Sequence, residues 1–188
     1  MKRFLLLAVA LLSLPVLSNA QSKPNNAIIQ QIRLLKAEET LELSFDQNSN
    51  TSKLMAVSEN FSSREAKRVG ILAMNFAVGF HYAGSGLSKS PDPILLTFWV
   101  LTKTPRFGEN HSLTVVTGDE MLVLGNARYV AKTRQDMEYL NFEISRTDLA
   151  KIAGQTDVRF KLGTAEFRFT PRQLKLFADL LAVSEIRQ

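Results

Sequence analysis

The sequence predicts an α+β fold: a predominantly antiparallel β-sheet, arranged as a meander, with a C-terminal amphipathic helix packed on it and one or two short helices. Three observations predict this class. Residues 72–82 alternate bulky with small side chains, several short apolar segments separated by glycine turns follow, and a capped amphipathic segment begins at Thr170. No internal repeat interrupts this order, so we expect residues 36–188 to form one domain, preceded by a polar lead-in and short helix over residues 21–35.

The strongest of these signals is the strict alternation within residues 72–82. A helix would mix the two sets of side chains, whereas a strand sends each set to its own face. The set expected to pack into the core is bulky: Leu72, Met74, Phe76, Val78, Phe80 and Tyr82. The opposite face carries Ala73, Asn75, Ala77, Gly79 and His81, so it is small or polar along its whole length.

Shorter strands are expected on both sides of this segment. Leu41, Leu43 and Phe45 alternate with polar residues, and another strand covers residues 53–58. Ile94–Thr102 (ILLTFWVLT) is apolar on both faces, which predicts a central strand that is covered on both sides. The meander continues through residues 112–117, 121–124, 127–132 and 137–144, with two-residue hairpin turns expected at Gly118-Asp119 and Gly125-Asn126.

Helices are predicted where a capping residue precedes apolar residues at helical spacing. They cover residues 27–35, about two turns after the capping pair Ser62 and Glu65, and residues 146–153 after the capping pair Ser145 and Asp148, ending at Gly154. Thr170, Pro171 and Gln173 supply the N-cap, the N1 proline and the capping-box partner of the last helix. Its predicted buried stripe is Leu174, Phe177, Ala178 and Leu181.

Residues 157–170 are expected to form a hairpin that turns at Gly163-Thr164. A two-residue turn pairs Phe160 with Phe167 and Lys161 with Glu166, and both pairs are favourable. The same register places Arg159 opposite Arg168, where two like charges face each other.

The N-terminus has the three parts of a secretory signal peptide. Lys2 and Arg3 precede an unbroken apolar run over residues 4–12, and Ser18-Asn19-Ala20 provides a cleavage site after Ala20. The alternative, a membrane anchor, would need about 20 predominantly apolar residues, and this run is shorter. We therefore expect residues 1–20 to be removed and the mature protein to be periplasmic or secreted, with no transmembrane segment. An exported domain without disulfides favours a bacterial source.

The composition excludes several classes of protein. The 188 residues are 45% hydrophobic and 22% charged, as in ordinary globular proteins. The absence of cysteine rules out thiol nucleophiles, thiolate zinc sites and iron–sulfur clusters. The net charge is +5, of which the signal peptide contributes Lys2 and Arg3, so the mature chain carries only a mild positive excess.

No motif in the chain predicts catalysis. The two histidines, His81 and His111, are far apart in sequence, and no zinc-protease, dinucleotide-binding, P-loop or nucleophile-elbow motif is present. None of the 18 acidic residues stands out as an isolated acid within an apolar strand. We therefore predict no catalytic residue, metal site or cofactor, although carboxylates that meet only in space could still form a hydrolytic pair.

Three places are predicted to bind a ligand or partner. His81 lies on the small face of its strand, where there is room for a ligand; the alternative is a hydrogen-bonded histidine beneath a loop. Phe107 is expected to be exposed in the loop of residues 103–111, which also holds His111; the alternative is a merely polar connection. Arg159, Lys161 and Arg168 share the outer face of the hairpin and could bind an anionic ligand or an acidic protein surface, or form only a solvated face.

Aromatic residues are not interleaved with these charges, so nucleic acid is not an expected partner. The predicted function is therefore an exported, non-enzymatic binding or interaction module. The alternatives are a periplasmic hydrolase that uses carboxylate or serine chemistry and a carrier that holds a small apolar ligand beside the small face of residues 72–82. A filled core would favour the interaction module, a deep apolar cavity the carrier, and acids converging in a cleft the enzyme.

Overall fold

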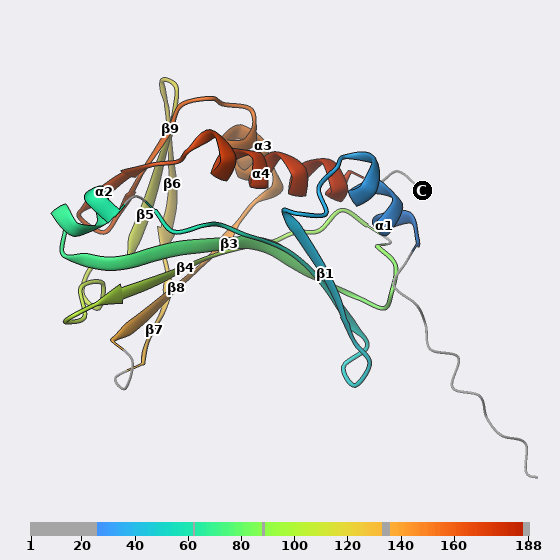
Figure 1. The fold of residues 1–188 in the computed structure, drawn as a ribbon, viewed down its shortest axis with the longest axis horizontal. Coiled ribbons are helices and arrows are strands. Elements are labelled where there is room, and N and C mark those ends of the chain that lie inside the picture. The colour runs from blue at the N-terminus through green and yellow to red at the C-terminus, as the bar shows by residue number, and fades with distance from the viewer. Residues whose placement is uncertain (1–25, 62, 88, 133–135, 186–188) are drawn as a thin grey trace, which may run out of the picture.

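The computed structural model describes residues 26–61, 63–87, 89–132 and 136–185. In this part of the chain, the strands form two antiparallel sheets, and the C-terminal helix packs against the larger one (Figure 1). The predicted α+β class is confirmed. The elements in chain order are α1 (Asn26–Leu34), β1 (Leu41–Asp46), β2 (Thr51–Val57), α2 (Ser63–Arg68), β3 (Ile71–Ala83), β4 (Ile94–Thr102), β5 (Ser112–Thr117), β6 (Glu120–Asn126), β7 (Arg128–Lys132), β8 (Met137–Ile144), α3 (Arg146–Ala153), β9 (Val158–Leu162), β10 (Ala165–Arg168) and α4 (Pro171–Ser184). The predicted signal peptide and Ser62, the predicted cap of α2, lie outside the described residues.

The meander is divided between the two sheets. The larger sheet has the strand order β1-β2-β3-β4-β8-β7, and the smaller has the order β10-β9-β5-β6. The hairpin β5–β6 leaves the larger sheet after β4, and the chain returns to it at β7. Gly118-Asp119 forms the predicted two-residue turn, because Thr117 pairs with Glu120.

The second predicted turn, at Gly125-Asn126, is wrong. β6 runs on through both residues, and the register shift between Leu113 and Thr114 leaves Leu124 as the extra residue of a bulge just before Gly125. Ala127 then joins β6 directly to β7, so this point is where the chain passes from one sheet to the other. A bulge and a hairpin turn both use a glycine, and the sequence does not distinguish them.

The C-terminal third matches the sequence prediction closely. Ser145 with Asp148 and Thr170 with Gln173 each form a complete capping box, which fixes the first turns of α3 and α4. The hairpin β9–β10 turns at Gly163-Thr164, with Gly163 at a positive φ of 56° that favours glycine. The buried face of α4 includes Leu174 and Phe177 as predicted, but it continues through Leu176, Leu180 and Val183, and the predicted Ala178 and Leu181 are only half-buried.

An aromatic core fills the space between the two sheets and α4. Phe76 of the larger sheet contacts Phe98, Phe169 and Phe177, and Phe98 contacts Phe160 of the smaller sheet. Phe169, which directly follows β10, also contacts Phe177 of α4. The closest ring pair, Phe160 and Phe169, has centroids 4.5 Å apart. Aromatic side chains from both sheets and from α4 therefore share one core.

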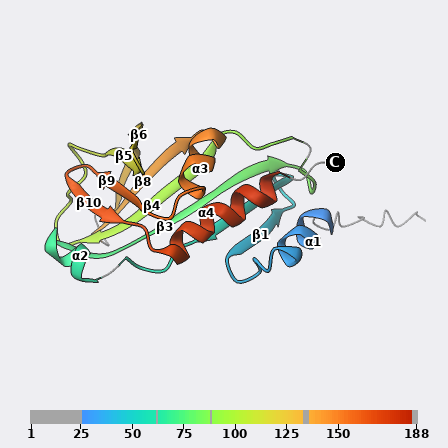
Figure 2. The same ribbon diagram turned by 90° about the horizontal axis from the view of Figure 1, so that it is seen from above.

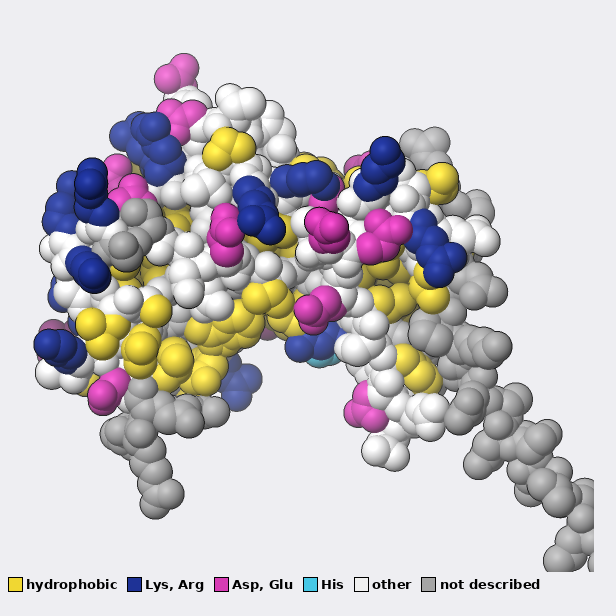
Figure 3. All heavy atoms as spheres, in the orientation of Figure 1, with side chains coloured by type: hydrophobic (Ala, Val, Ile, Leu, Met, Phe, Trp, Pro, Cys, Tyr) yellow, Lys and Arg dark blue, Asp and Glu magenta, His cyan; other side chains and the backbone are white. Residues whose placement is uncertain are grey.

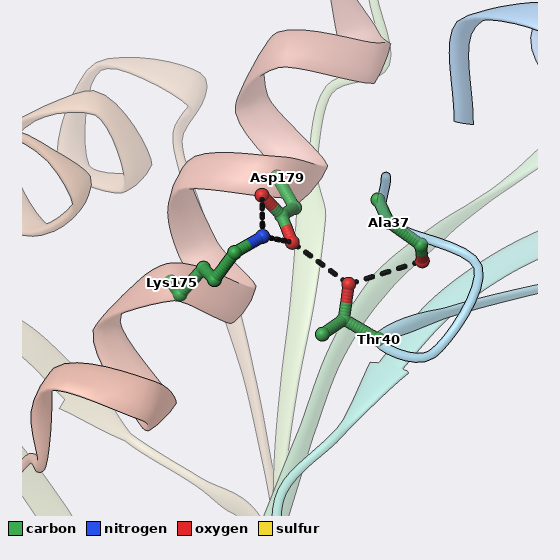
Figure 4. Close-up of polar contacts among 4 residues, drawn as sticks. All are labelled: Ala37, Thr40, Lys175 and Asp179. Carbon is green, nitrogen blue, oxygen red and sulfur yellow. Dashed lines mark hydrogen bonds and ion pairs between the residues drawn. The ribbon is translucent and has the colours of Figure 1, made fainter. Parts of the chain in front are cut away.

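A buried polar group ties the N-terminal segment to α4. Asp179 of α4 lies near Thr40, whose hydroxyl is 2.7 Å from Asp179 Oδ2 and 3.0 Å from the Ala37 carbonyl oxygen (Figure 4). The Lys175 ammonium group donates to both carboxylate oxygens of Asp179, at 2.7 and 2.6 Å. The connection between α1 and β1 is therefore fixed on the same helix that covers the sheet.

Two predictions about the central strands are wrong. Leu72 is not in the core, because a bulge between Ile71 and Ala73 places Ile71 there instead and leaves Leu72 46% exposed. The prediction that residues 94–102 are covered on both sides also fails. Leu96, Phe98 and Val100 are buried beneath α4 and the smaller sheet, but the alternate side chains Leu95, Thr97, Trp99 and Leu101 are only half-buried.

Candidate functional site

The most distinctive surface of the protein is the face of the larger sheet that points away from α4. Both α4 and the smaller sheet lie above the opposite face, and the sheet arches so that its free side is concave (Figures 1 and 2). We call this surface the concave face. It is formed by Met55, Val57, Asn75, Ala77, Gly79, Leu95, Thr97, Trp99, Leu101, Tyr139 and Asn141. Hydrophobic side chains run along this hollow underside of the molecule (Figure 3).

The small side chains of β3 form the floor of the concave face. Ala77 pairs with Val57 on one side and Thr97 on the other, and Gly79 pairs with Met55 and Leu95. Gly79 could not be replaced, because a Cβ atom there would lie 2.3 Å from the Leu54 carbonyl oxygen. A glycine inside a strand can mark the close approach of another backbone, and here that backbone is the neighbouring strand β2, with the Met55 side chain beside it. The predicted small face of residues 72–82 therefore lies on the concave side of the sheet, next to Met55.

Two hollows lie on the concave face, one on each side of β3. One, of about 560 Å³, lies over β4 and β8 and is closed at its side by Leu124 and Asn126 of β6. The other, of about 480 Å³, lies between Trp99 and the strands β1 and β2. Both volumes are in the usual range of ligand sites, but both hollows are open depressions and neither is a deep internal cavity.

Charged residues stand at both borders of the concave face and, with Lys53, also on β2. One rung of paired residues crosses five strands as Glu42, Met55, Gly79, Leu95 and Glu143, so it has an exposed carboxylate at each end. In the adjacent row of paired residues, Arg128 on β7 pairs with Asn141 on β8. In the row on the opposite side of Gly79, Lys53 on β2 pairs with His81 on β3. Charges of both signs are therefore present around the face, and Lys53 lines the hollow beside Trp99.

His81 lies on the same side of the sheet as the concave face, two residues beyond Gly79 on β3. It is exposed rather than packed beneath a loop, and it stands opposite Lys53 on β2. Partial burial and the positive charge of Lys53 lower the pKa of His81, so the neutral imidazole predominates at pH 7. Its predicted role in ligand binding stays a prediction, but its position is compatible with the concave face.

Phe107 is not exposed as predicted. Its side chain is 2% exposed and fills the space beside Gly163, where it closes one end of the gap between the two sheets. His111 of the same loop lies 3.1 Å from the Phe107 carbonyl oxygen through Nδ1, and its ring stacks on Tyr129 at 5.8 Å. The loop of residues 103–111 is therefore anchored by the buried side chain of Phe107, while most of its other residues are exposed.

The position of this loop is explained by a residue that the sequence analysis missed. Glu138 of β8 is 1% exposed, and its carboxylate accepts hydrogen bonds from the backbone N–H groups of Arg106 and Phe107, both at 2.9 Å. The hydroxyl groups of Tyr129 and Thr102 donate to the same carboxylate, each at 3.0 Å. Burial, together with this carboxylate, raises the pKa of Tyr129 to about 12.

A signal for Glu138 was present in the sequence. In the segment MEYLNFEI, Glu138 has the same alternation as Leu140, Phe142 and Ile144, all of which are in the core. The statement that no acid stands isolated within an apolar strand was therefore wrong. Because the carboxylate accepts four hydrogen bonds and is sealed from solvent, we interpret it as a structural clamp on the loop.

The basic face predicted on the hairpin has the expected register. Arg159 pairs with Arg168, and Lys161 pairs with Glu166. Each arginine also approaches an acid: Arg168 Nε lies 3.3 Å from Asp157, and an Arg159 guanidinium nitrogen lies 3.7 Å from Glu166. These exposed ion pairs moderate the repulsion between the arginines, and binding of an anion by Arg159, Lys161 and Arg168 stays a prediction.

Neither the site nor the chain points to known chemistry. In the described ranges, no group of three or more histidine and acidic residues could hold a metal ion, and no helix is both long and apolar enough to span a bilayer. Comparison of the chain with protein-family models, curated proteins and solved structures gave no match. The functional interpretation therefore depends on the concave face itself.

Proposed function

We propose that the protein is an exported, non-enzymatic binding module and that its binding surface is the concave face. The observation that carries the proposal is the position of Trp99, the single tryptophan of the chain. It lies half-buried on β4 at the centre of a concave, apolar sheet face that no described element covers. Solvent-facing sheet faces normally carry polar side chains, whereas this one presents large apolar side chains around Trp99, with Asn75, Thr97 and Asn141 as polar groups among them.

The kinds of residue on this face support binding of a partner. Tryptophan, tyrosine and methionine are enriched in the centres of interfaces, and lysine and glutamate are depleted there. Trp99, Tyr139 and Met55 belong to the concave face, and the charged residues stand at its borders. The filled aromatic core supports a binding module over a carrier with an internal cavity.

The proposal is tested with a neutral apolar dye, prodan, which absorbs light where tryptophan emits. Energy transfer from Trp99 to bound prodan is expected in the native protein. Val57→Lys puts a charge on the border of the concave face and should reduce the transfer several-fold. The matched control is Val123→Lys, because Val123 is also an exposed strand valine but lies on β6 of the other sheet. Transfer that is absent, or equally affected by both substitutions, would contradict the proposal.

Export is tested separately by the mass of the secreted protein. Intact-mass analysis of protein recovered from the periplasm or medium is expected to show the loss of residues 1–20, so that the chain starts at Gln21. Recovery of only the full-length chain from the membrane fraction would contradict export of a soluble module.

A further inference from the structure

We infer that the hollow over β4 and β8 binds a small zwitterion, an α-amino acid with an apolar side chain, whose carboxylate contacts Arg128 and whose ammonium group contacts Glu143. This inference rests on the proposed function and names the class of ligand that one part of the concave face fits. The walls of the hollow, its two charges and its apolar lining each support it.

The hollow has walls from both sheets. Its volume is about 560 Å³, and it is lined by β4, β7 and β8 of the larger sheet and by β6 of the smaller sheet. Leu124, the extra residue of the bulge in β6, and Asn126 close one side of it. Bulges are over-represented beside functional sites, because the extra residue re-aims a side chain. A ligand here would contact both layers of the fold, whereas the hollow beside Trp99 is lined by the larger sheet alone.

Two polar side chains are fixed on the floor of the hollow. The Thr97 hydroxyl donates to Asn141 Oδ1 at 2.9 Å, and Asn141 Nδ2 donates to the Arg128 carbonyl oxygen at 3.2 Å. These contacts hold the Asn141 amide in one orientation and tie the backbone of Arg128 to β8, where the two residues are also paired. The side chain of Arg128 therefore starts from a fixed position beside the hollow.

Arg128 and Glu143 bring opposite charges to this hollow. Both side chains line it and are exposed, and neither forms an ion pair or a side-chain hydrogen bond in the part of the chain that the structure describes. Glu143 lies two residues beyond Asn141 on β8, so it is a diagonal neighbour of Arg128, with Cα atoms roughly 7–8 Å apart.

The spacing of these two charges suits an α-amino acid. Its carboxylate and ammonium groups are bonded to the same carbon atom, so one molecule can lie between Arg128 and Glu143 and neutralise both. The guanidinium group matches a carboxylate with two parallel hydrogen bonds. An anion or a cation alone would leave one of the two side chains without a partner.

The rest of the lining is largely apolar. Leu95, Leu124 and Val130 stand around the two charged residues, and Val130 is 44% exposed. Sites for small molecules commonly combine an apolar lining with a few polar groups that fix the orientation of the ligand. An aliphatic side chain on the ligand would cover this apolar surface, so the probe we choose is L-leucine.

Two analogues of leucine separate the contributions of its charged groups. Isocaproate has the same side chain and the carboxylate but no ammonium group, and isoamylamine has the side chain and the ammonium group but no carboxylate. Calorimetric titration at pH 7 is expected to show that leucine binds at least tenfold more tightly than either analogue, because each analogue loses one set of charge-assisted hydrogen bonds. In NMR spectra, leucine should shift the amide signals of β6, β7 and β8 and leave those of β1 unchanged.

Single substitutions test the two contacts. Glu143→Gln is expected to weaken leucine binding at least tenfold and to leave isocaproate unaffected, since isocaproate has no ammonium group. Arg128→Gln should likewise weaken leucine and leave isoamylamine unaffected. The matched controls are Glu42→Gln, at an exposed glutamate that lines the other hollow, and Arg33→Gln, at an exposed arginine of α1. Both controls should keep the original affinity, and circular dichroism should show all variants folded.

The other outcomes overturn the inference in distinguishable ways. If leucine binds no more tightly than its two analogues, or if both glutamine variants at the hollow keep the original affinity, then Arg128 and Glu143 only neutralise each other across the two strands. If the leucine-dependent shifts centre on β1 and β2, the ligand lies in the other hollow. If leucine does not bind while Trp99 still transfers energy to prodan, the proposed function stands and the zwitterion fails. If neither leucine nor prodan binds, the proposed function itself fails.

Discussion

Replacement of Glu138 is the sharpest test of how the loop of residues 103–111 is held. The carboxylate is 1% exposed and accepts two backbone N–H groups, from Arg106 and Phe107, through one oxygen. In Glu138→Ala these two donors lose their acceptor inside the protein. The hydroxyl groups of Thr102 and Tyr129 can rotate toward other partners, so their loss should matter less.

The magnitude follows from the number of stranded donors. A buried donor left without an acceptor costs about 1–3 kcal/mol, so the two donors stranded in Glu138→Ala are expected to lower the unfolding free energy by about 2–6 kcal/mol. Glu138→Gln keeps an oxygen for the backbone groups, and its amide can donate to the Thr102 hydroxyl. Only the charge assistance is lost, so the expected cost is about 1–2 kcal/mol. Glu143→Ala, on the same strand but exposed, is the control and should cost little.

Two measurements check this order of stability. Denaturant melts should rank the variants as Glu143→Ala, Glu138→Gln and Glu138→Ala, from least to most destabilised. Limited trypsin digestion should cut after Arg106 much faster in Glu138→Ala than in Glu143→Ala, because the loop is released before the sheets unfold. Equal losses for alanine and glutamine, or an unchanged rate of cutting after Arg106, would refute the clamp.

Three further predictions concern the core, a tyrosine and the basic face. Phe76 is fully buried among aromatic rings, so Phe76→Ala should cost about 3–5 kcal/mol in denaturant melts, and Asn75→Ala on the half-buried opposite face should cost less; equal losses would contradict the packing. The pKa of Tyr129 is about 12 in the folded protein and about 10 when unfolded, so the folded state holds this proton more tightly. Its contribution to stability is complete below about pH 10 and is lost as the pH rises toward 12, and Tyr129→Phe should show a smaller fall across this interval in melts at stepped pH. Arg168→Glu breaks only a solvent-exposed ion pair and should change the unfolding free energy by less than about 1 kcal/mol; a larger loss would mean that the basic face has a structural role.

Several local patterns were predicted correctly because the determining contacts lie close together in sequence, although the turn predicted at Gly125-Asn126 was not. Both capping boxes, at Ser145 and Thr170, depend on residues three positions apart, and both form as expected. The register of β9–β10, including Arg159 opposite Arg168, follows from the length of its turn. The burial of Phe76 follows from alternation within a single strand.

Errors arose where the outcome depended on distant segments. The bulge at Leu72 is a mismatch between β3 and β4, and a single strand carries no signal of its partner's register. Phe107 stands in a polar loop, yet Glu138, far along the chain, draws that loop over the gap between the sheets. The alternation around Glu138 was visible, but only the fold supplied the four donors that make a buried carboxylate tolerable.

The sequence by itself determined the class of fold, the caps, the hairpin register and which strand faces are apolar, because each depends on periodicity or on near neighbours. It also indicated that both faces of β4 are apolar, from which we expected other elements to cover the strand on both sides. Only the tertiary structure decided that α4 and the smaller sheet cover the same side, so that Trp99 and its neighbours remain on an open concave face. The hydrophobic effect specifies that apolar area prefers to be buried, but it is not directional and does not specify what will bury it.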